Sequence, residues 1–420
     1  MRRPELCLAA VPEPTIAIRA GRLVDVSAAE VLEDRQLLIE GERIASVSPW
    51  SGSAPGGADL IDLSEFTVSP GLFDCHTHVA DNVQASSYVE TLTRSGAQQA
   101  FVGVENARAT LEAGFTSCRD VGTFRAFVDV ALRDAIDRGV VPGPRMAVAG
   151  AYVTVATGGG EITGLAPDVE IPREFRFGVV GSIPEIRARV REILNRGADH
   201  IKVIATGAVL APGTKPGVPE FTEEELRAIV EEASGYGAFV AAHAHGAEGI
   251  KRAVRAGVRS VEHGSLIDDE GIALMAERGT YLVADIYNGD FIAEEGSREG
   301  WPEETLRKNA ETTQAQRDGF RKAVEAGVKI AFGTDSGVYP HGWNARQLPY
   351  MVRHGMTPMQ AIRSATLTAA ELMGWEERLG SLDAGKLADV IAVHGDATSD
   401  VGRFQDVAFV MKGGAVAKRP

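Results

Sequence analysis

The stretch from Phe73 to Val79 reads FDCHTHV and ends an apolar run, so two histidines stand two residues apart at the end of a candidate buried strand. Residues i and i+2 of a strand point to the same face, which groups His76 with His78 and turns Thr77 away. Two imidazoles on one face can bind one divalent metal ion at about 2.0–2.1 Å. A lone histidine at a strand end is more often a hydrogen-bonded structural residue, so the metal interpretation depends on the rest of the chain.

Similar apolar runs recur along the middle of the chain and alternate with helical patterns such as residues 102–114, 184–197, 222–237 and 248–257. Strands that alternate with helices predict parallel βαβ units. We count eight strand candidates, which predict an α/β fold, a (β/α)8 TIM barrel over residues 69–379. The eight are GLFDCHTHV, FTSCRDVG, PRMAVAGAYVT, HIKVIATG, AFVAAHAHG, RSVEHGS, TYLVADIYN and KIAFGTDSG.

Punctuation residues support the helices of this pattern. Thr222 followed by Glu225 matches a capping box before an apolar periodic segment. Glycines are expected to end helices in the left-handed conformation just before the next strand. The glycines in these positions are Gly114, Gly197, Gly257, Gly279 and Gly327.

Both ends of the chain show a different, period-2 pattern. Residues 15–68 alternate apolar and polar side chains between Gly, Asp and Pro breaks, and the same style returns after Gly380. We therefore expect a small β-sandwich domain built from residues 1–68 and 380–420, packed against the barrel.

Composition excludes several classes of protein. The chain has 420 residues and a formal net charge of -15, and an acidic surface repels phosphate backbones, so nucleic acid is not expected as a partner. Three widely spaced cysteines, Cys7, Cys75 and Cys118, argue against a disulfide framework. No run of about 18 apolar residues predicts a membrane span. The N-terminal MRRPELCLAAVPEP is too short and Pro-interrupted for a secretion signal, so we expect a cytoplasmic protein; the alternative is export, with a leader already removed.

Polar residues gather where the barrel strands end, the edge at which barrel enzymes hold their chemistry. Five of the nine histidines fall there, together with one lysine and one aspartate. Singly, each has a structural explanation: a packed histidine, a buried salt-bridged lysine, a turn aspartate. If every one of these residues were structural, several independent coincidences would have to fall at one edge of the barrel. The set is His76, His78, Lys202, His243, His245, His263 and Asp335.

Lys202 needs a chemical explanation, because an ammonium group repels metal cations. A neutral amine avoids this repulsion, and a carbamate formed with carbon dioxide becomes a carboxylate that could bridge two metal ions about 3.5–4 Å apart. Asp335 could then serve both as a ligand and as the base that accepts a proton from water.

The motifs PGLFDCHTH, IKV with Lys202, AAHAHG, EHGS and GTDSG, in this order, resemble the binuclear-metal amidohydrolase superfamily. The chain is most similar to the imidazolonepropionase-like branch that includes Xaa-Pro dipeptidases, Xaa-Arg/Lys carboxypeptidases and ochratoxin amidohydrolases. The resemblance implies two divalent ions, with zinc expected: His76, His78 and Asp335 on one, His243 and His263 on the other, and carboxylated Lys202 on both. It implies that His245 is no ligand but hydrogen-bonds the substrate carbonyl or oxyanion.

One loop departs from that branch. Relatives often carry Gly-Gly-His-Gly after the third strand, whereas this chain has Thr157 followed by three glycines and Glu161. The run around Gly160 is expected to line the substrate pocket and to leave room for a large group, while Glu161 is expected to face solvent. Three further residues are candidate substrate contacts. Asp81 lies in the first loop, with an exposed loop acid as the alternative; Val209, with Leu210, could form an apolar wall; Tyr287 could donate to a substrate carboxylate, with a packed tyrosine as the alternative.

The predicted activity is hydrolysis of an amide bond by attack of a metal-bridging hydroxide, which releases a C-terminal amino acid from an N-acyl amino acid or dipeptide; ochratoxin A fits this chemistry. The alternative is a cyclic-amide hydrolase of the imidazolonepropionase or dihydroorotase kind. A barrel that kept its fold but lost activity would be expected to lose ligands, and all six ligand positions are filled. The resemblance also implies a homo-oligomer, up to an octamer.

Overall fold

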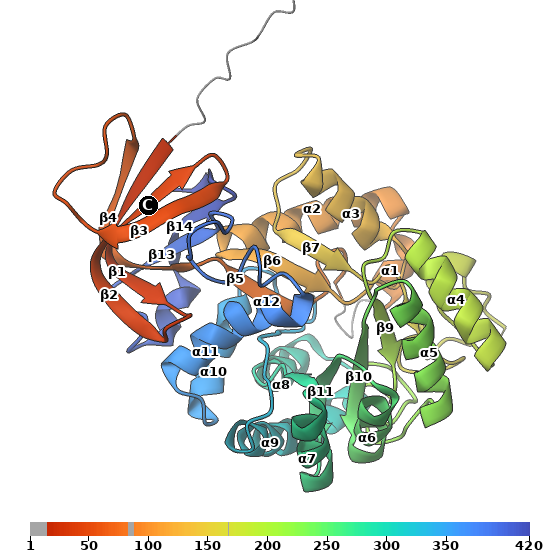
Figure 1. Cartoon of the computed structure of the whole chain (residues 1–420). Coiled ribbons are helices and arrows are strands. Elements are labelled where there is room, and N and C mark those ends of the chain that lie inside the picture. Colours follow the sequence, from red (N-terminus) through yellow and green to blue (C-terminus); the bar gives the residue numbers. More distant parts are fainter. Residues whose placement is uncertain (1–14, 83–87, 167) are drawn as a thin grey trace, which may run out of the picture.

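The computed structural model describes residues 15–82, 88–166 and 168–420 (Figure 1). Its barrel strands form two parallel sheets, one with the order β5-β6-β7 and one with the order β12-β11-β10-β9-β8. The bounds are β5 (Leu72–Thr77), β6 (Phe115–Asp120), β7 (Arg145–Val148), β8 (Tyr152–Val153), β9 (Ile201–Ile204), β10 (Val240–Gly246), β11 (Ser260–Leu266) and β12 (Tyr281–Val283).

Residues 329–337 join the two sheets and take the place of the eighth barrel strand. Parallel bridges connect Leu282 with Ile330 and Thr77 with Ser336. Backbone hydrogen bonds from Cys75 N to Phe332 O and from Asp335 N to His76 O, each 2.8 Å, carry the segment along β5. The predicted single strand 144–154 is interrupted instead, because Gly150 adopts φ 73° between β7 and β8.

Both chain ends contribute to one seven-stranded mixed sheet, with the order β15-β14-β13-β4-β1-β2-β3. In Figure 1 the strands from the N-terminal end and those from the C-terminal end lie together at one end of the molecule. Their buried side chains, such as Ile18, Leu37 and Phe409, form a core of their own. The bounds are β1 (Thr15–Asp25), β2 (Glu30–Glu40), β3 (Arg43–Pro49), β4 (Asp59–Pro70), β13 (Val390–His394), β14 (Val407–Lys412) and β15 (Ala415–Lys418).

Helices surround the barrel, and α4–α7 cover its β9–β11 side (Figure 1). The predicted capping box is confirmed, since Glu225 N lies 3.2 Å from Thr222 Oγ1 and Thr222 N 2.8 Å from Glu225 Oε2. All five predicted helix-ending glycines have φ between 68° and 99°. The helices are α1 (Tyr88–Thr93), α2 (Gly96–Glu112), α3 (Val128–Asp137), α4 (Ile183–Asn195), α5 (Glu223–Gly235), α6 (Ala247–Ala256), α7 (Asp269–Arg278), α8 (Asn288–Glu299), α9 (Glu303–Glu325), α10 (Gln347–Arg353), α11 (Pro358–Ser364) and α12 (Leu367–Met373).

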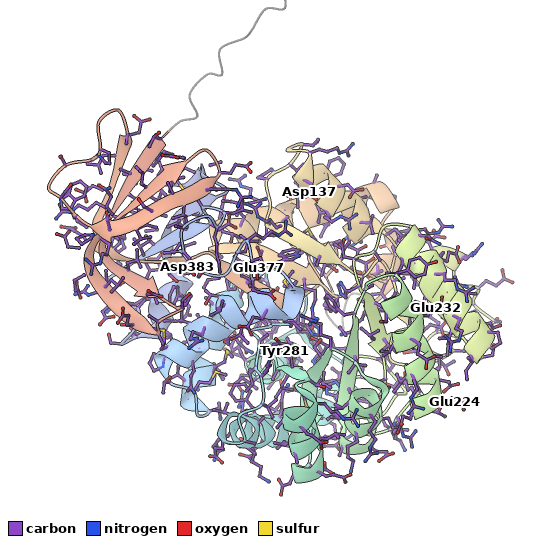
Figure 2. All side chains as sticks on the ribbon, viewed as in Figure 1. Asp137, Glu224, Glu232, Tyr281, Glu377 and Asp383 are labelled. Atoms are coloured by element: carbon purple, nitrogen blue, oxygen red, sulfur yellow. The ribbon has the colours of Figure 1, made fainter. Side chains whose placement is uncertain are left out.

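The predicted fold class, a barrel with a small β unit from both chain ends, is confirmed, whereas the domain boundaries at 68/69 and 379/380 stay a prediction. Figure 2 shows charged side chains such as Glu224 on the outer surface of the helix layer. Among the described helices, none is long and apolar enough to cross a membrane. Cys75 and Cys118 are buried free thiols; Cys7 and the leader-like residues 1–14 lie outside the described residues.

Candidate metal centre and active site

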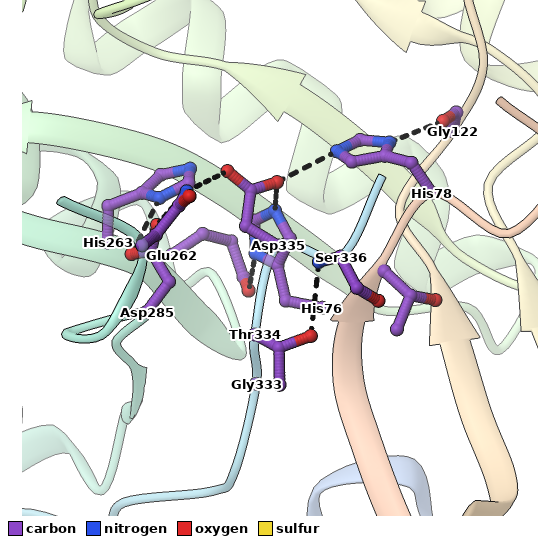
Figure 3. Close-up of polar contacts among 12 residues, drawn as sticks. His76, His78, Gly122, Glu262, His263, Asp285, Gly333, Thr334, Asp335 and Ser336 are labelled. Atoms are coloured by element: carbon purple, nitrogen blue, oxygen red, sulfur yellow. Dashed lines mark hydrogen bonds and ion pairs between the residues drawn. The ribbon is translucent and has the colours of Figure 1, made fainter. Parts of the chain in front are cut away.

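His76, His78 and Asp335 converge at the carboxyl ends of the barrel strands (Figure 3). Nε2 of His76 lies 3.3 Å, and Nε2 of His78 3.2 Å, from the same oxygen, Oδ1 of Asp335. Burial raises the pKa of Asp335, but the two imidazoles beside Oδ1 outweigh burial and hold that pKa well below its usual range. The predicted first ligand group is therefore assembled around a charged carboxylate.

The other ring nitrogen of each histidine has a partner that fixes the ring. Nδ1 of His76 lies 2.8 Å from Oε2 of Glu262, and Nδ1 of His78 lies 2.8 Å from the carbonyl oxygen of Gly122. A carboxylate and a carbonyl only accept, so both Nδ1 atoms carry the proton. Each Nε2 is then left to face Asp335, the arrangement found in metal sites whose ligands are oriented by outer partners.

His243 and His263 form a second group beside the first. Nδ1 of His263 donates to Oδ1 of Asp285 at 3.0 Å, and Nε2 of His243 lies 3.4 Å from the carbonyl oxygen of Gly207. This leaves Nε2 of His263 and Nδ1 of His243 as candidate ligand atoms. His245 lies with them, since ligand atoms of all three histidines fall within 4.8 Å of one another.

Lys202 lies on β9, is 1% exposed, and is near enough to both groups for its charge to lower the pKa of His76 and of His243. Burial lowers the pKa of its amine from the model-peptide value of 10.5 to about 8, although the charges of Glu262, Asp335 and Asp285 act in the opposite direction. A substantial fraction of the amine is therefore neutral at mildly alkaline pH. A neutral amine is the form that reacts with carbon dioxide.

Two of the candidate ligands have a left-handed backbone. His263 has φ 68° and Asp335 has φ 60°, a region that side-chain-bearing residues seldom occupy. Such strained conformations gather at functional sites, where the surrounding structure enforces them. Here the left-handed backbone turns the side chains of His263 and Asp335 out of the regular strand alternation and toward the other candidate ligands. As a result, Glu262 and His263 both face the candidate ligand group although they are adjacent in sequence.

The donor chemistry fits divalent metal ions. Two imidazole lone pairs and a carboxylate oxygen face one another at 3.2–3.3 Å, a contact that requires protons or a cation between them. Imidazole and carboxylate are ligands that zinc, manganese, cobalt and iron share. The histidine and aspartate groups could thus hold a metal ion.

The groups open into a cavity that is lined by residues from several barrel strands and from α8 and α9. Apolar side chains and glycines form much of its wall, and α8 and α9 contribute most of its neutral polar groups. Of the predicted substrate contacts, Gly160 and Val209 line this cavity, as does His245. The residues used below are Phe124, Tyr152, Gly159, Ile204, Leu210 and Asn288.

Asp81 and Tyr287 are not among the residues that line the cavity, so the structure gives neither the predicted substrate contact. Asp81 is buried and accepts hydrogen bonds from Gln99 Nε2 at 2.9 Å and Phe124 N at 3.3 Å, which fasten the first loop. The Tyr287 ring packs against Tyr339, with ring centroids 5.1 Å apart, and its hydroxyl accepts from Arg346.

The expectation that Glu161 faces solvent is wrong. Its side chain is buried, accepts from Thr157 N at 2.6 Å, and pairs with Arg176. The glycines beside it do not create empty space either: a Cβ on Gly160 would lie 2.6 Å from Ile204 Cγ1. The glycines instead let the backbone pack directly against the strand that carries Lys202.

Several residues of the site were not singled out from sequence. Glu262 directly precedes His263, and Asp285 lies two residues after β12, within the seventh predicted strand; both positions were visible as polar residues near strand ends. Asn288, whose Nδ2 donates to Oδ2 of Asp285 and to Oδ2 of Asp335 at 3.1 and 3.0 Å, lies at the start of a helix and carries no comparable signal.

Comparisons with known proteins agree with this architecture. A model of the amidohydrolase family matches residues 67–418. An ochratoxinase of Aspergillus niger is 34% identical, with 100% of this chain and 90% of the ochratoxinase covered; an imidazolonepropionase of Deinococcus radiodurans is 27% identical, with 92% and 91% covered. The crystal structure of an Xaa-Pro dipeptidase with bound methionine in the active site has a TM-score of 0.90 and 40% identity, with 96% of this chain and 99% of the dipeptidase covered. The chain belongs to the amidohydrolase family and is a hydrolase enzyme.

Proposed function

We propose that this enzyme hydrolyses the amide bond of N-acyl amino acids or dipeptides and releases the C-terminal amino acid, with ochratoxin A as a candidate substrate. The observation that carries the proposal is the convergence of His76, His78 and Asp335 at the base of a largely apolar cavity. The similarity to an ochratoxinase and to an Xaa-Pro dipeptidase supports the same bond type.

We assign two divalent metal ions to the centre, with zinc as the expected metal. His76, His78 and Asp335 would hold one ion, His243 and His263 the other, and carboxylated Lys202 both. Ions bound there would polarise an amide carbonyl and make a nearby water more acidic. The neutral fraction of Lys202 at mildly alkaline pH supports the carbamate.

Asp335 is suited to act as the base and proton carrier. Asn288 holds its Oδ2 at 3.0 Å, which fixes the direction of the carboxylate. In the proposed reaction Asp335 accepts the proton of the attacking water and delivers it to the leaving nitrogen.

His245 is suited to stabilise the oxyanion. Burial lowers its pKa to about 3, so the ring is neutral, and Ser265 Oγ lies 2.8 Å from Nδ1. When the hydroxyl donates to Nδ1, the proton of the ring sits on Nε2 and can be donated to a substrate oxygen. Single donors of this kind contribute about 2.7–4 kcal/mol to transition-state stability.

Release of amino acids from a substrate panel tests the proposal. Zinc-loaded enzyme would be offered N-acyl amino acids, dipeptides and ochratoxin A, with an Asp335→Asn variant as the control for contaminating activity. Release by the wild-type enzyme and none by the variant supports the proposal. No release from any member, with two metal ions bound, contradicts it.

The alternative is a cyclic-amide hydrolase, which the similarity to an imidazolonepropionase favours. Ring opening of an imidazolone or a dihydropyrimidine by enzyme that is silent on the linear panel would establish the alternative. A mononuclear centre without carboxylated Lys202 would favour it as well. The predicted homo-oligomer is a separate proposal, which light scattering of the purified protein tests.

A further inference from the structure

The loop Thr157–Glu161 forms one wall of the cavity, and a carboxylate from outside the loop holds it. Both carboxylate oxygens of Glu220 accept from Gly159 N, at 2.9 and 3.0 Å. Gly159 and Gly160 line the cavity, whereas Glu220 does not. We propose that Glu220 is a positioning residue that sets the selectivity of the cavity for a planar aromatic acyl group; this inference rests on the proposed amide hydrolysis.

The shape of this wall favours a flat ligand. Phe124 and Tyr152 pack edge to face with centroids 5.5 Å apart, and both line the same cavity as Ile204 and the two glycines. Glycine backbone presents a thin, planar surface to a ligand. An aromatic ring is the group that such a backbone, two aromatic side chains and an isoleucine accommodate with the most contact.

The loop keeps this shape only while its backbone lies close to its neighbours. A Cβ on Gly160 would lie 2.6 Å from Ile204, and a Cβ on Gly159 would lie 3.0 Å from Ala208 N. A small outward displacement of Gly159 would therefore change the width of the aromatic subsite. Two hydrogen bonds from outside the loop resist this displacement. Gly159 N donates to Glu220 at 2.9 Å, and Gly160 N donates more weakly to Thr154 Oγ1 at 3.3 Å.

Partial burial of the Glu220 carboxylate costs free energy. The neighbouring carboxylate, Glu161, is balanced by Arg176. For Glu220, by contrast, no cationic partner is present in the described part of the chain, and burial raises its pKa to about 7. A partly buried carboxylate without a cationic partner is unfavourable unless hydrogen bonds compensate for the lost hydration, and the hydrogen bond from Gly159 N is the compensation here. Holding Gly159 is the contact that the structure shows.

The test varies only the acyl group. N-acetyl-, N-benzoyl- and N-(2-naphthoyl)-L-phenylalanine would be compared as substrates of wild-type enzyme, Glu220→Ala, Glu220→Gln and the control Glu224→Gln. Glu224 is exposed on α5, close in sequence but outside the cavity (Figure 2). Because one hydrogen bond is at stake, we expect Glu220→Ala to lower the naphthoyl-to-acetyl ratio of kcat/KM about five- to tenfold, through KM. Glu220→Gln keeps an acceptor oxygen and should restore most of the ratio.

A second variant approaches the same contact from the loop. A Cβ on Gly158 would lie 2.5 Å from Oε2 of Glu220, so Gly158→Ala should displace the carboxylate and lower the ratio in the same way. Equal loss on all three substrates, or an unchanged ratio in both Glu220→Ala and Gly158→Ala, would overturn the inference. Absence of hydrolysis by the wild-type enzyme would instead refute the proposed function on which it rests.

Discussion

Nδ1 of His76 lies 2.8 Å from Oε2 of Glu262, and the other oxygen of Glu262 lies 2.7 Å from Nη2 of Arg119. All three side chains are buried. Burial raises the pKa of Glu262, but the charge of Arg119 and the hydrogen bond from His76 outweigh it, so the carboxyl is held ionised. The contact with Glu262 keeps the proton of His76 on Nδ1, so that Nε2 faces Asp335 as a possible metal ligand.

Replacing Glu262 by Gln should weaken metal binding while keeping the shape of the side chain. The amide loses the charge that orders Arg119 and His76, and changes to such outer partners typically cost about 10–100-fold in metal affinity or activity. Metal titration of the apoenzyme measures the effect, with the exposed Glu277→Gln as the matched control. Unchanged metal affinity would show that Glu262 serves packing alone.

Replacing His245 by Ala should separate catalysis from metal binding. If His245 acts on the substrate oxygen, kcat falls about 10²–10³-fold while both metal ions remain. His245 lies close enough to His243 and His263 to be a ligand instead. Elemental analysis of the purified variant decides between the two roles, because loss of one ion per chain would make His245 a ligand.

Lys202 should make the metal-free protein more stable at alkaline pH. Its folded-state pKa, about 8, lies below the 10.5 of the unfolded chain, so the unfolded state binds more protons between these values. The free energy of unfolding of wild type, relative to Lys202→Met, should therefore rise as pH increases from about 8 to 10.5, by at most about 3 kcal/mol. Urea unfolding of both proteins in chelator measures it. A difference that stays flat or falls with pH would show that the amine is not desolvated.

The zinc-loaded form gives a separate test of Lys202. Lys202→Ala should lower both metal content and turnover if the side chain bridges two ions. Addition of a short carboxylic acid, which can occupy the vacated space, should restore part of both. A variant that retains two ions and full turnover would exclude the bridging role.

The fold and the rim of the barrel could be predicted because their sequence patterns correspond to a single arrangement in space. Alternating strands and helices predicted the barrel, and polar residues at strand ends predicted its rim. The eighth strand was predicted from KIAFGTDSG, and the structure shows why the segment is irregular: it pairs through isolated bridges and turns at Asp335, φ 60°. Such a local distortion depends on neighbours far along the chain and has no local pattern.

Side-chain orientation in loops was predicted less well. Asp81 and Glu161 were treated as loop acids, but Gln99 and Arg176, both distant in sequence, draw them into buried contacts. The glycines after Thr157 predicted the loop but not its purpose. Glycine suits both an open space and close backbone packing, so the sequence does not distinguish the two. The position of Ile204 shows that the backbone is closely packed here.

Gly333 illustrates how a glycine in the irregular eighth strand can control the metal centre. A Cβ there would lie 2.2 Å from Val283 Cγ1 and 2.9 Å from Cβ of His76. Gly333→Ala should therefore destabilise the fold by about 1–3 kcal/mol, as overpacking does, and also displace His76 and lower metal affinity.

A double variant separates the two effects of this substitution. Val283→Ala removes the nearer clash, so Gly333→Ala/Val283→Ala should recover part of the thermal stability that Gly333→Ala loses, measured against Val283→Ala alone. Metal affinity should stay low, because the contact with His76 persists. Gly235→Ala, at a helix position with nothing within 4 Å, is the control and should leave both quantities unchanged or slightly raise stability. Full recovery of metal affinity in the double variant would mean that the close approach to His76 is relieved by backbone movement, so that Gly333 shapes the core and not the ligand.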